Sequence, residues 1–142
     1  MHNIRLEKLD YSEQHKILDI INNDKCLKET FGGDTNTISR ILNSSYVAII
    51  KKEKIDIGFI MIVDNNSINE IDVGIISKYQ NQGYGTYALS LLKKIITKEK
   101  INVKIEVKIT NIKAIKVVLK NGFKLIKKNE KYNYYSNINK SI

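Results

Sequence analysis

The chain has 142 residues, enough for one domain with a substantial core, and 42% of them are hydrophobic. Lysine and arginine outnumber aspartate and glutamate by 24 to 15, which gives a formal net charge of +9. No apolar run approaches the roughly 20 residues that span a bilayer, and the segment MHNIRLEKLD lacks the apolar stretch of a secretory signal. Because Cys26 is the one cysteine, an internal disulfide is excluded, and we expect a cytoplasmic protein without a membrane partner.

The first half of the chain predicts one strand, two helices and then two strands. Weak alternation of apolar and polar residues from Asn3 to Leu9 predicts the first strand. Ser12 is a candidate N-cap for the helix that follows, and the polar run at 22–24 would end it. The remaining elements of this half are a loop at 31–34, a short helix at 37–42, and the two strands of a hairpin at 46–51 and 55–63.

The second half is organised around a strand, a tight turn and a helix. Alternation at 70–75 predicts the strand, and apolar residues at helical spacing from Ala88 to Ile96 predict the helix. Gly83 and Gly85 lie between them, where glycine lets a backbone turn tightly and approach a ligand closely. The elements that complete the chain are a strand at 102–109, a helix at 111–120, two strands at 123–127 and 132–135, and a polar tail from Ser136 that we expect to be frayed.

The resulting order is β-α-α-β-β-β-α-β-α-β-β, with no proline, linker or repeat. This order predicts an α/β (α+β) fold with a mixed sheet, in a single domain that spans residues 1–142.

The turn that contains the two glycines is a candidate anion site. The first N–H groups of a helix have no intrahelical partners, so this turn could receive a phosphate. It is not the dinucleotide fingerprint, because Gln80 stands where the first glycine is required, and no Gly-Lys-Ser/Thr follows. A purely structural turn would use the same glycines.

A second pattern consists of Asn111, Ala114 three positions later, and Gly122-Phe123 after the helix. Alone, Asn111 is most often a helix cap and Gly122 a helix stop. In this order and at this separation, Gln80-x-x-Gly-x-Gly and this second pattern together resemble the GNAT superfamily of acyl-CoA-dependent N-acyltransferases. The resemblance covers nearly the whole chain, and it implies a mostly antiparallel sheet flanked by helices.

Within that superfamily the chain resembles the branch of the ribosomal-protein alanine N-acetyltransferases. The residues that carry this finer match are Asn23-Asp24, Glu70-Ile71, the run Gly83 to Thr86, and Ala88-Leu89.

The resemblance implies acetyl-CoA as the acyl donor, and it implies no metal. It implies that backbone groups of Ile75, Ile76 and Ser77 bind the pantetheine arm, that N–H groups of Gln82, Gly83, Tyr84, Gly85 and Thr86 hold the pyrophosphate, and that Asn111 contacts the arm. Lys116 and Lys120 are candidates for the remaining phosphate, although both also suit a plain lysine-rich surface.

Two carboxylates are candidates for the general base. Glu70 and Asp72 alternate on one strand and therefore point the same way, with Glu70 preferred. Two carboxylates held close together can raise one pKa of the pair toward neutrality. The competing interpretation is that these acids are simply the wet face of the strand.

One position departs from the superfamily pattern. Many members have a tyrosine seven residues after the motif asparagine, where it protonates the leaving thiolate, but this chain has Val118. A thiol has a pKa near 8.5, so a thiolate can leave without full protonation. Tyr84 and the tyrosines at 132, 134 and 135 are possible substitutes, or they are packing residues.

We therefore predict an acetyl-CoA-dependent N-acetyltransferase that acts on a primary amine, either a protein N-terminus or a small amine. One rival is an acyl-CoA-binding module with weakened catalysis, which Val118 would explain. A second rival is a basic nucleic-acid-binding protein, which we do not expect because the lysines are scattered and no stacking aromatic motif accompanies them. The sequence leaves open the amine, the acyl chain, the general acid, and the choice between monomer and homodimer.

Overall fold

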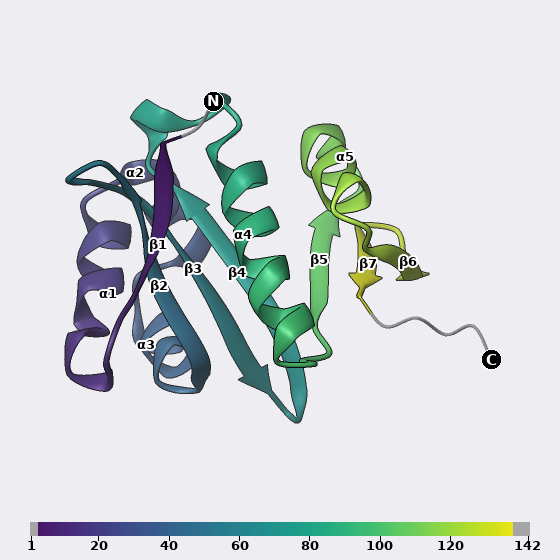
Figure 1. Cartoon of the computed structure of the whole chain (residues 1–142), viewed down its shortest axis with the longest axis horizontal. Coiled ribbons are helices and arrows are strands. Elements are labelled where there is room, and N and C mark those ends of the chain that lie inside the picture. The colour runs from purple at the N-terminus through teal and green to yellow at the C-terminus, as the bar shows by residue number, and fades with distance from the viewer. Residues whose placement is uncertain (1–2, 138–142) are drawn as a thin grey trace.

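The computed structural model describes residues 3–137, whose strands form one seven-stranded sheet (Figure 1). The strands are β1 (Ile4–Lys8), β2 (Ser44–Lys52), β3 (Ile55–Asn65), β4 (Ile68–Ile75), β5 (Lys104–Lys108), β6 (Lys124–Lys128) and β7 (Tyr132–Ser136). The helices are α1 (His15–Asn22), α2 (Lys25–Phe31), α3 (Thr35–Leu42), α4 (Tyr84–Lys98) and α5 (Ile112–Lys120). Two short 3-10 turns are η1 (Tyr11–Glu13) and η2 (Ser77–Tyr79).

The strands follow the order β1-β2-β3-β4-β5-β7-β6, and every neighbouring pair except β4 and β5 is antiparallel. The mixed, mostly antiparallel sheet predicted from the sequence is therefore confirmed. β3 pairs with the whole of β4, from Ile68 to Ile75. In contrast, one register match, Glu70 with Lys104, joins β4 to β5. Figure 1 shows the two strands diverging toward their C-terminal ends.

Each face of the sheet has its own apolar cluster, because side chains alternate across a strand. Ile60 and Ile62 of β3 belong to the cluster that includes α4, α5, β5 and β7. Phe59 and Met61 of the same strand belong to the cluster formed with α1, α2 and α3. The helices thus divide between the two faces, with α1–α3 on one side and α4 and α5 on the other.

Three helices, rather than the two we predicted, lie between β1 and β2. Asp24 caps α2, with its Oδ2 accepting the N–H of Leu27 at 3.1 Å, and Gly32 ends the helix at a φ of 86°. Asp34 caps α3 in the same way, with its Oδ1 accepting two backbone N–H groups. The extra helix is α2, and it results from the Asp24 cap and the Gly32 stop. The sequence analysis interpreted Asp24 as the end of the preceding helix and Gly32 as part of a loop.

The structure also corrects two predicted boundaries. Ser12 lies within η1 and caps no α-helix, since α1 begins at His15. The polar tail does not begin at Ser136, which is buried at the end of β7. The predicted fraying of 138–142 lies outside the described residues. Across residues 3–137, no helix is both long enough and apolar enough to cross a membrane.

Candidate functional site

The candidate site lies where β4 parts from β5. Ile76 donates its N–H to the carbonyl oxygen of Ile57 at 2.8 Å, so this pair is hydrogen-bonded across to β3. Because hydrogen-bonded and non-hydrogen-bonded pairs alternate along antiparallel strands, Ile75 directs its N–H and C=O toward the other edge of β4. The match of β5 to β4 is confined to Glu70 and Lys104. The backbone edge at Ile75 therefore faces the opening between the strands.

The N–H of Ile75 points into the opening, whereas its carbonyl oxygen accepts from Gln80 Nε2 at 2.9 Å. The next two residues that the sequence analysis assigned to the pantetheine arm, Ile76 and Ser77, are more fully engaged. Beyond its N–H bond to β3, Ile76 accepts the N–H of Tyr79 at 2.8 Å on its carbonyl. Ser77 donates its N–H and its Oγ to the Asp24 carboxylate, at 3.0 and 2.9 Å. Burial raises the pKa of Asp24, but the hydrogen bonds from Ser77 and from the backbone N–H groups of Leu27 and Cys26 together outweigh it, and the pKa lies below its ordinary value. These groups of Ile76 and Ser77 are thus engaged within the chain.

The turn between β4 and α4 is anchored by side chains at both ends. Gln80 donates from Nε2 to the carbonyl oxygen of Ile75 at 2.9 Å, which folds the turn back onto the end of the strand. At the other end, the Tyr84 ring is buried and packs edge-to-face against Tyr79, with centroids 6.3 Å apart. Lys52 places its Nζ 5.4 Å from the centroid of the Tyr84 ring. Tyr84 therefore holds the turn through its side chain, while its N–H belongs to the first turn of α4.

The first turn of α4 has an uncovered backbone. Gly83 is the N-cap, at a φ of 84° where glycine is favoured, and no side chain caps the helix. A Cβ on Gly85 would meet one atom within 4 Å, the Cγ1 of Ile75 at an ordinary 3.7 Å. Glycine in a helix costs about 1 kcal/mol relative to alanine, yet packing within the protein does not require it here. Gln82 and Thr86 flank these glycines. The bare turn fits an anionic ligand that closely approaches the backbone.

The start of α5 reaches this turn from across the opening. Asn111 caps α5, with its Oδ1 accepting a backbone N–H at 3.1 Å. Lys113, two residues later, donates from Nζ to the Oδ1 of Asn81 in the turn at 3.2 Å. The choice of Lys116 and Lys120 as phosphate candidates stays a prediction, and it did not include Lys113. No sequence pattern links Lys113 to Asn81, because the contact joins segments that are 32 residues apart in the chain.

At the other end of the opening, Glu70 and Asp72 lie side by side and share one arginine. Arg40, in the last turn of α3, donates from Nε to Asp72 Oδ2 at 3.0 Å and from Nη2 to Asp72 Oδ1 at 3.0 Å. Its Nη2 also lies 3.2 Å from Glu70 Oε1. The exposed fractions of the two acidic side chains are 17% for Glu70 and 16% for Asp72, so both are mostly covered. The sequence analysis found both acids but not the arginine, which lies 30 residues or more away in the chain.

The two carboxylates are bound differently. Both oxygens of Asp72 accept from Arg40, and burial nevertheless keeps the pKa of Asp72 above its ordinary value. Glu70 accepts from Arg40 and from Asn65 Nδ2, at 3.3 Å, on the same oxygen, Oε1. No hydrogen bond from residues 3–137 reaches its Oε2. Of the two predicted bases, Glu70 is therefore the one with an oxygen available to a substrate.

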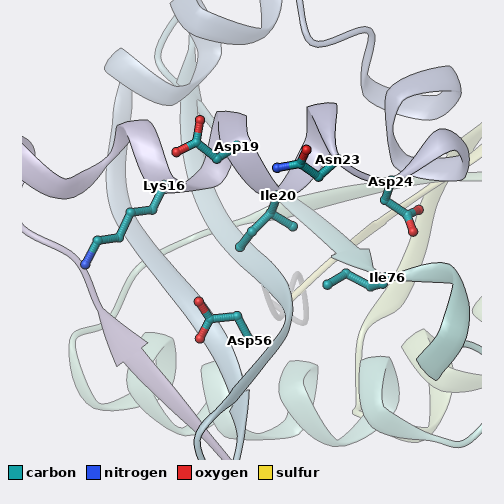
Figure 2. A pocket seen from close by; sticks show the side chains of 7 residues that line it. All are labelled: Lys16, Asp19, Ile20, Asn23, Asp24, Asp56 and Ile76. Carbon is teal, nitrogen blue, oxygen red and sulfur yellow. The ribbon is translucent and has the colours of Figure 1, made fainter.

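A separate hollow of about 390 Å³ lies beside α1, at the end of β4 (Figure 2). It is lined by Lys16, Asp19, Ile20, Asn23, Asp24, Asp56 and Ile76. Two of its three carboxylates are engaged within the chain, since Asp24 binds Ser77 and Asp56 lies 2.8 Å from Lys51 Nζ. This hollow lies on the α1 side of the sheet and is not the opening between β4 and β5.

Comparison with known proteins identifies the family. The sequence model of the family described as "Acetyltransferase (GNAT) domain" matches residues 22–124, which is most of the chain. The chain belongs to the GNAT acetyltransferase family. No functionally curated protein matches its sequence.

Solved GNAT structures share the fold of the whole chain at low sequence identity. The ribosomal-protein alpha-N-acetyltransferase RimL, in complex with coenzyme A, has a TM-score of 0.71 at 14% identity, covering 96% of this chain and 94% of its own. A spermidine N-acetyltransferase from Vibrio cholerae has a TM-score of 0.67 at 14% identity, covering 94% and 92%. A microcin C7 self-immunity acetyltransferase, in complex with acetyl-CoA and AMP, has a TM-score of 0.64 at 17% identity, covering 94% and 91%. The predicted resemblance to the ribosomal-protein branch is confirmed at the level of the fold.

Val118, where the chain departs from the GNAT pattern, is a core residue. Val118 lies on α5 and is buried in the apolar cluster that includes Phe123 and Tyr135. Tyr135 is itself buried, with its hydroxyl oxygen accepting from Asn133 at 3.0 Å. Tyr84 and Tyr135 therefore serve as packing residues in this structure.

Replacing Arg40 should reveal what it does for the acidic pair. In Arg40→Met, Asp72 loses its partner, so its pKa rises further above that of the unfolded chain. When the pKa of Asp72 is higher in the folded than in the unfolded chain, the carboxyl group stabilises the fold at pH values below the unfolded pKa. This contribution is lost as pH rises through the folded pKa. We expect a loss of about 1–3 kcal/mol in the free energy of unfolding near pH 7 and a smaller loss near pH 4, measured by urea denaturation.

The matched control is Arg5→Met, because the Arg5 side chain is 58% exposed, pairs with Glu7 at 3.8 Å and donates to the carbonyl oxygen of Glu53 at 2.7 Å, all on the surface. This variant should change stability little at either pH. An equal loss at both pH values in Arg40→Met would contradict the electrostatic role.

Proposed function

We propose that this GNAT protein transfers an acetyl group from acetyl-CoA to a primary amine, at a protein N-terminus or on a small molecule. The observation that supports the proposal is the opening between β4 and β5, where the N–H of Ile75 points away from β3 and an uncapped helix turn lies at the end of the strand. In this proposal the extended pantetheine arm adds to β4 at Ile75 like a further strand. The amides from Gln82 to Thr86 receive the pyrophosphate, assisted by the dipole of α4.

Three polar residues around the opening complete the proposed donor site. Lys113 is already held near the turn by Asn81 and supplies a positive charge beside the phosphates. Asn111 borders the opening from the start of α5. The open space next to Gly85 fits the phosphates of the donor. Glycine at this helix position lowers helix propensity, and packing within the protein does not explain its presence.

In the proposed reaction Glu70 removes the proton from the attacking amine. The amine nitrogen forms a bond to the acetyl carbon, the carbon–sulfur bond breaks, and the proton passes to Glu70 Oε2, directly or through one water. Arg40 and Asp72 act as positioning residues, because Arg40 donates to the other oxygen of Glu70 and Asp72 in turn holds Arg40. Val118 supplies no acid, so the thiolate leaves without help from that position.

The amine must be neutral in order to attack, and this requirement favours some acceptors over others. Deprotonating a lysine amine at pH 7 costs about 4–5 kcal/mol, whereas an α-amine costs about 1–1.5 kcal/mol. A single carboxylate such as Glu70, with one oxygen available as a base, suits an α-amine better than a lysine amine, because the α-amine costs less free energy to deprotonate. The RimL structure is that of an alpha-N-acetyltransferase and the Vibrio cholerae structure that of a spermidine N-acetyltransferase, so both acceptor classes belong in the first screen. A cytoplasmic location, which the single cysteine favours, is part of the proposal.

A thiol-release assay tests the function directly. The protein is incubated with acetyl-CoA and with either short peptides or polyamines, and free coenzyme A is detected by its thiol. We expect release that depends on the amine, together with a mass increase of one acetyl group on the acceptor. Peptides with blocked N-termini are the control. Binding of coenzyme A without thiol release from any amine would favour the rival, a binding module.

Glu70→Gln should slow turnover while leaving donor binding intact. The amide keeps the shape of the side chain but cannot accept the proton, so we expect kcat to fall by about 10²-fold. The affinity for coenzyme A, measured by calorimetry, should stay unchanged, as should the activity of the surface control Glu99→Gln. A wild-type kcat in Glu70→Gln would exclude Glu70 as the base.

Gly85→Val should separate donor binding from folding. The new side chain contacts little within the protein but fills the space where the phosphate would lie. We expect the Kd for coenzyme A to rise by about tenfold or more, while the melting temperature stays equal or increases because valine is a better helix former than glycine. Thr97→Val, near the other end of α4, is the control and should change neither value. An unchanged Kd for coenzyme A in Gly85→Val would contradict the proposal that this turn binds the pyrophosphate.

A further inference from the structure

The second half of the sheet has one covered face and one open face. On the covered face, Ile105 and Val107 of β5 and Tyr135 of β7 pack in the cluster that includes α5. On the opposite face, the cluster around α1, α2 and α3 contains no residue of β5, β6 or β7 among residues 3–137. Figure 1 shows α1, α2 and α3 gathered near β1, β2 and β3, away from β5, β7 and β6. The open face of these last three strands is therefore available to a partner.

Lysine and tyrosine dominate this open face, because paired residues in neighbouring strands point the same way. Glu106, Tyr134 and Lys127 form one row across the three strands, and Lys108 pairs with Tyr132 in the next. Lys104 begins a third row. We name this surface the lysine–tyrosine face, and its residues are Lys104, Glu106, Lys108, Lys124, Lys127, Tyr132 and Tyr134. It carries four lysines and one glutamate.

The lysine–tyrosine face adjoins the candidate base. Lys104 is the residue of β5 that is matched with Glu70 of β4, so their side chains lie on the same face of the sheet. A chain that rests on the lysine–tyrosine face can therefore place its end beside Glu70.

We propose that this face binds an acidic polypeptide segment, and that the acceptor is a protein whose N-terminal amine is followed by aspartate and glutamate residues. This inference rests on the proposed function, for which it names the substrate class. The excess of lysine complements carboxylates, and such complementarity speeds encounter and selects partners. The flexible lysines on neighbouring strands can each reach a different carboxylate along an extended chain.

Two features of the same face argue for a polypeptide over a nucleic acid. Lys104 places its Nζ 4.8 Å from the centroid of the Tyr134 ring and Lys127 places its own at 6.0 Å, so this ring is engaged by cations and is not bare for stacking on bases. Glu106, which is exposed on β5 between Lys104 and Lys108, would repel a continuous phosphate backbone. Arginine, the usual residue for bidentate phosphate recognition, does not occur on this face.

The test compares peptides that share their first residues and differ in the rest. One carries Asp and Glu after the N-terminal residues, the second carries Asn and Gln in their place, and a single-stranded oligonucleotide serves as a third ligand. Binding is measured by fluorescence anisotropy with coenzyme A present, and kcat/KM is measured by thiol release. We expect the acidic peptide to bind, and to react, about tenfold better than its neutral counterpart at low salt, with the difference shrinking as salt is added.

The variant for this test is Lys108→Glu combined with Lys127→Glu, two exposed positions of the lysine–tyrosine face that do not adjoin Glu70. It should abolish the preference for the acidic peptide and leave the affinity for coenzyme A unchanged. The matched control is Lys94→Glu with Lys98→Glu, on the exposed side of α4, which should keep the preference.

Each outcome separates this inference from the proposed function. Thiol release that is equal for the acidic and neutral peptides would overturn the inference alone. Binding of the acidic peptide without thiol release would support the face and contradict the enzyme. Tighter binding of the oligonucleotide than of the acidic peptide, lost in the Lys108→Glu, Lys127→Glu variant, would assign the face to nucleic acid and overturn the inference.

Discussion

The parting of β4 from β5 after one register match, Glu70 with Lys104, is the constraint on which the rest of the structure depends. Backbone N–H and C=O groups are obligatory hydrogen-bonding groups, so a strand edge that faces an opening requires a partner. If β4 and β5 were paired along their whole length, the backbone groups of Ile75 on this edge would be hydrogen-bonded to β5. Because they separate, the N–H of Ile75 is not paired with β5, the Ile75 carbonyl accepts from Gln80, and the uncovered first turn of α4 lies at the end of this edge. One feature of the sheet thus generates both parts of the proposed donor site.

The same parting organises the charges around it. Arg40 satisfies both oxygens of Asp72 and one oxygen of Glu70, so two covered carboxylates can lie side by side without an unpaired negative charge on each. Removing one partner of such a group is costly, which ties α3 firmly to β4. The arrangement treats two chemically similar side chains differently, since both oxygens of Asp72 accept from Arg40 whereas the hydrogen bonds of Glu70 from the described residues use Oε1 alone. On the far side of Lys104, the open lysine–tyrosine face extends the site toward the end of the chain.

Local patterns predicted the parts of this structure that depend on local chemistry. Alternation identified the strands, including β4 with its two acids, and the glycines at 83 and 85 placed the turn before α4. The third helix before β2 was missed because the caps at Asp24 and Asp34 resemble ordinary loop residues in sequence. Contacts between distant segments could not be predicted. Arg40 and Lys113 have no pattern that points to β4 or to the turn, since only the folded sheet brings α3 and α5 to them.

A crystal structure of the protein with coenzyme A would test the central claim most directly. The account predicts an extended pantetheine arm that lies along β4 in the opening, with an amide in hydrogen-bond contact with the backbone of Ile75. It also predicts a diphosphate on the amides of the first turn of α4. Coenzyme A bound elsewhere, for example in the hollow beside α1, or an empty opening at saturating ligand, would contradict it.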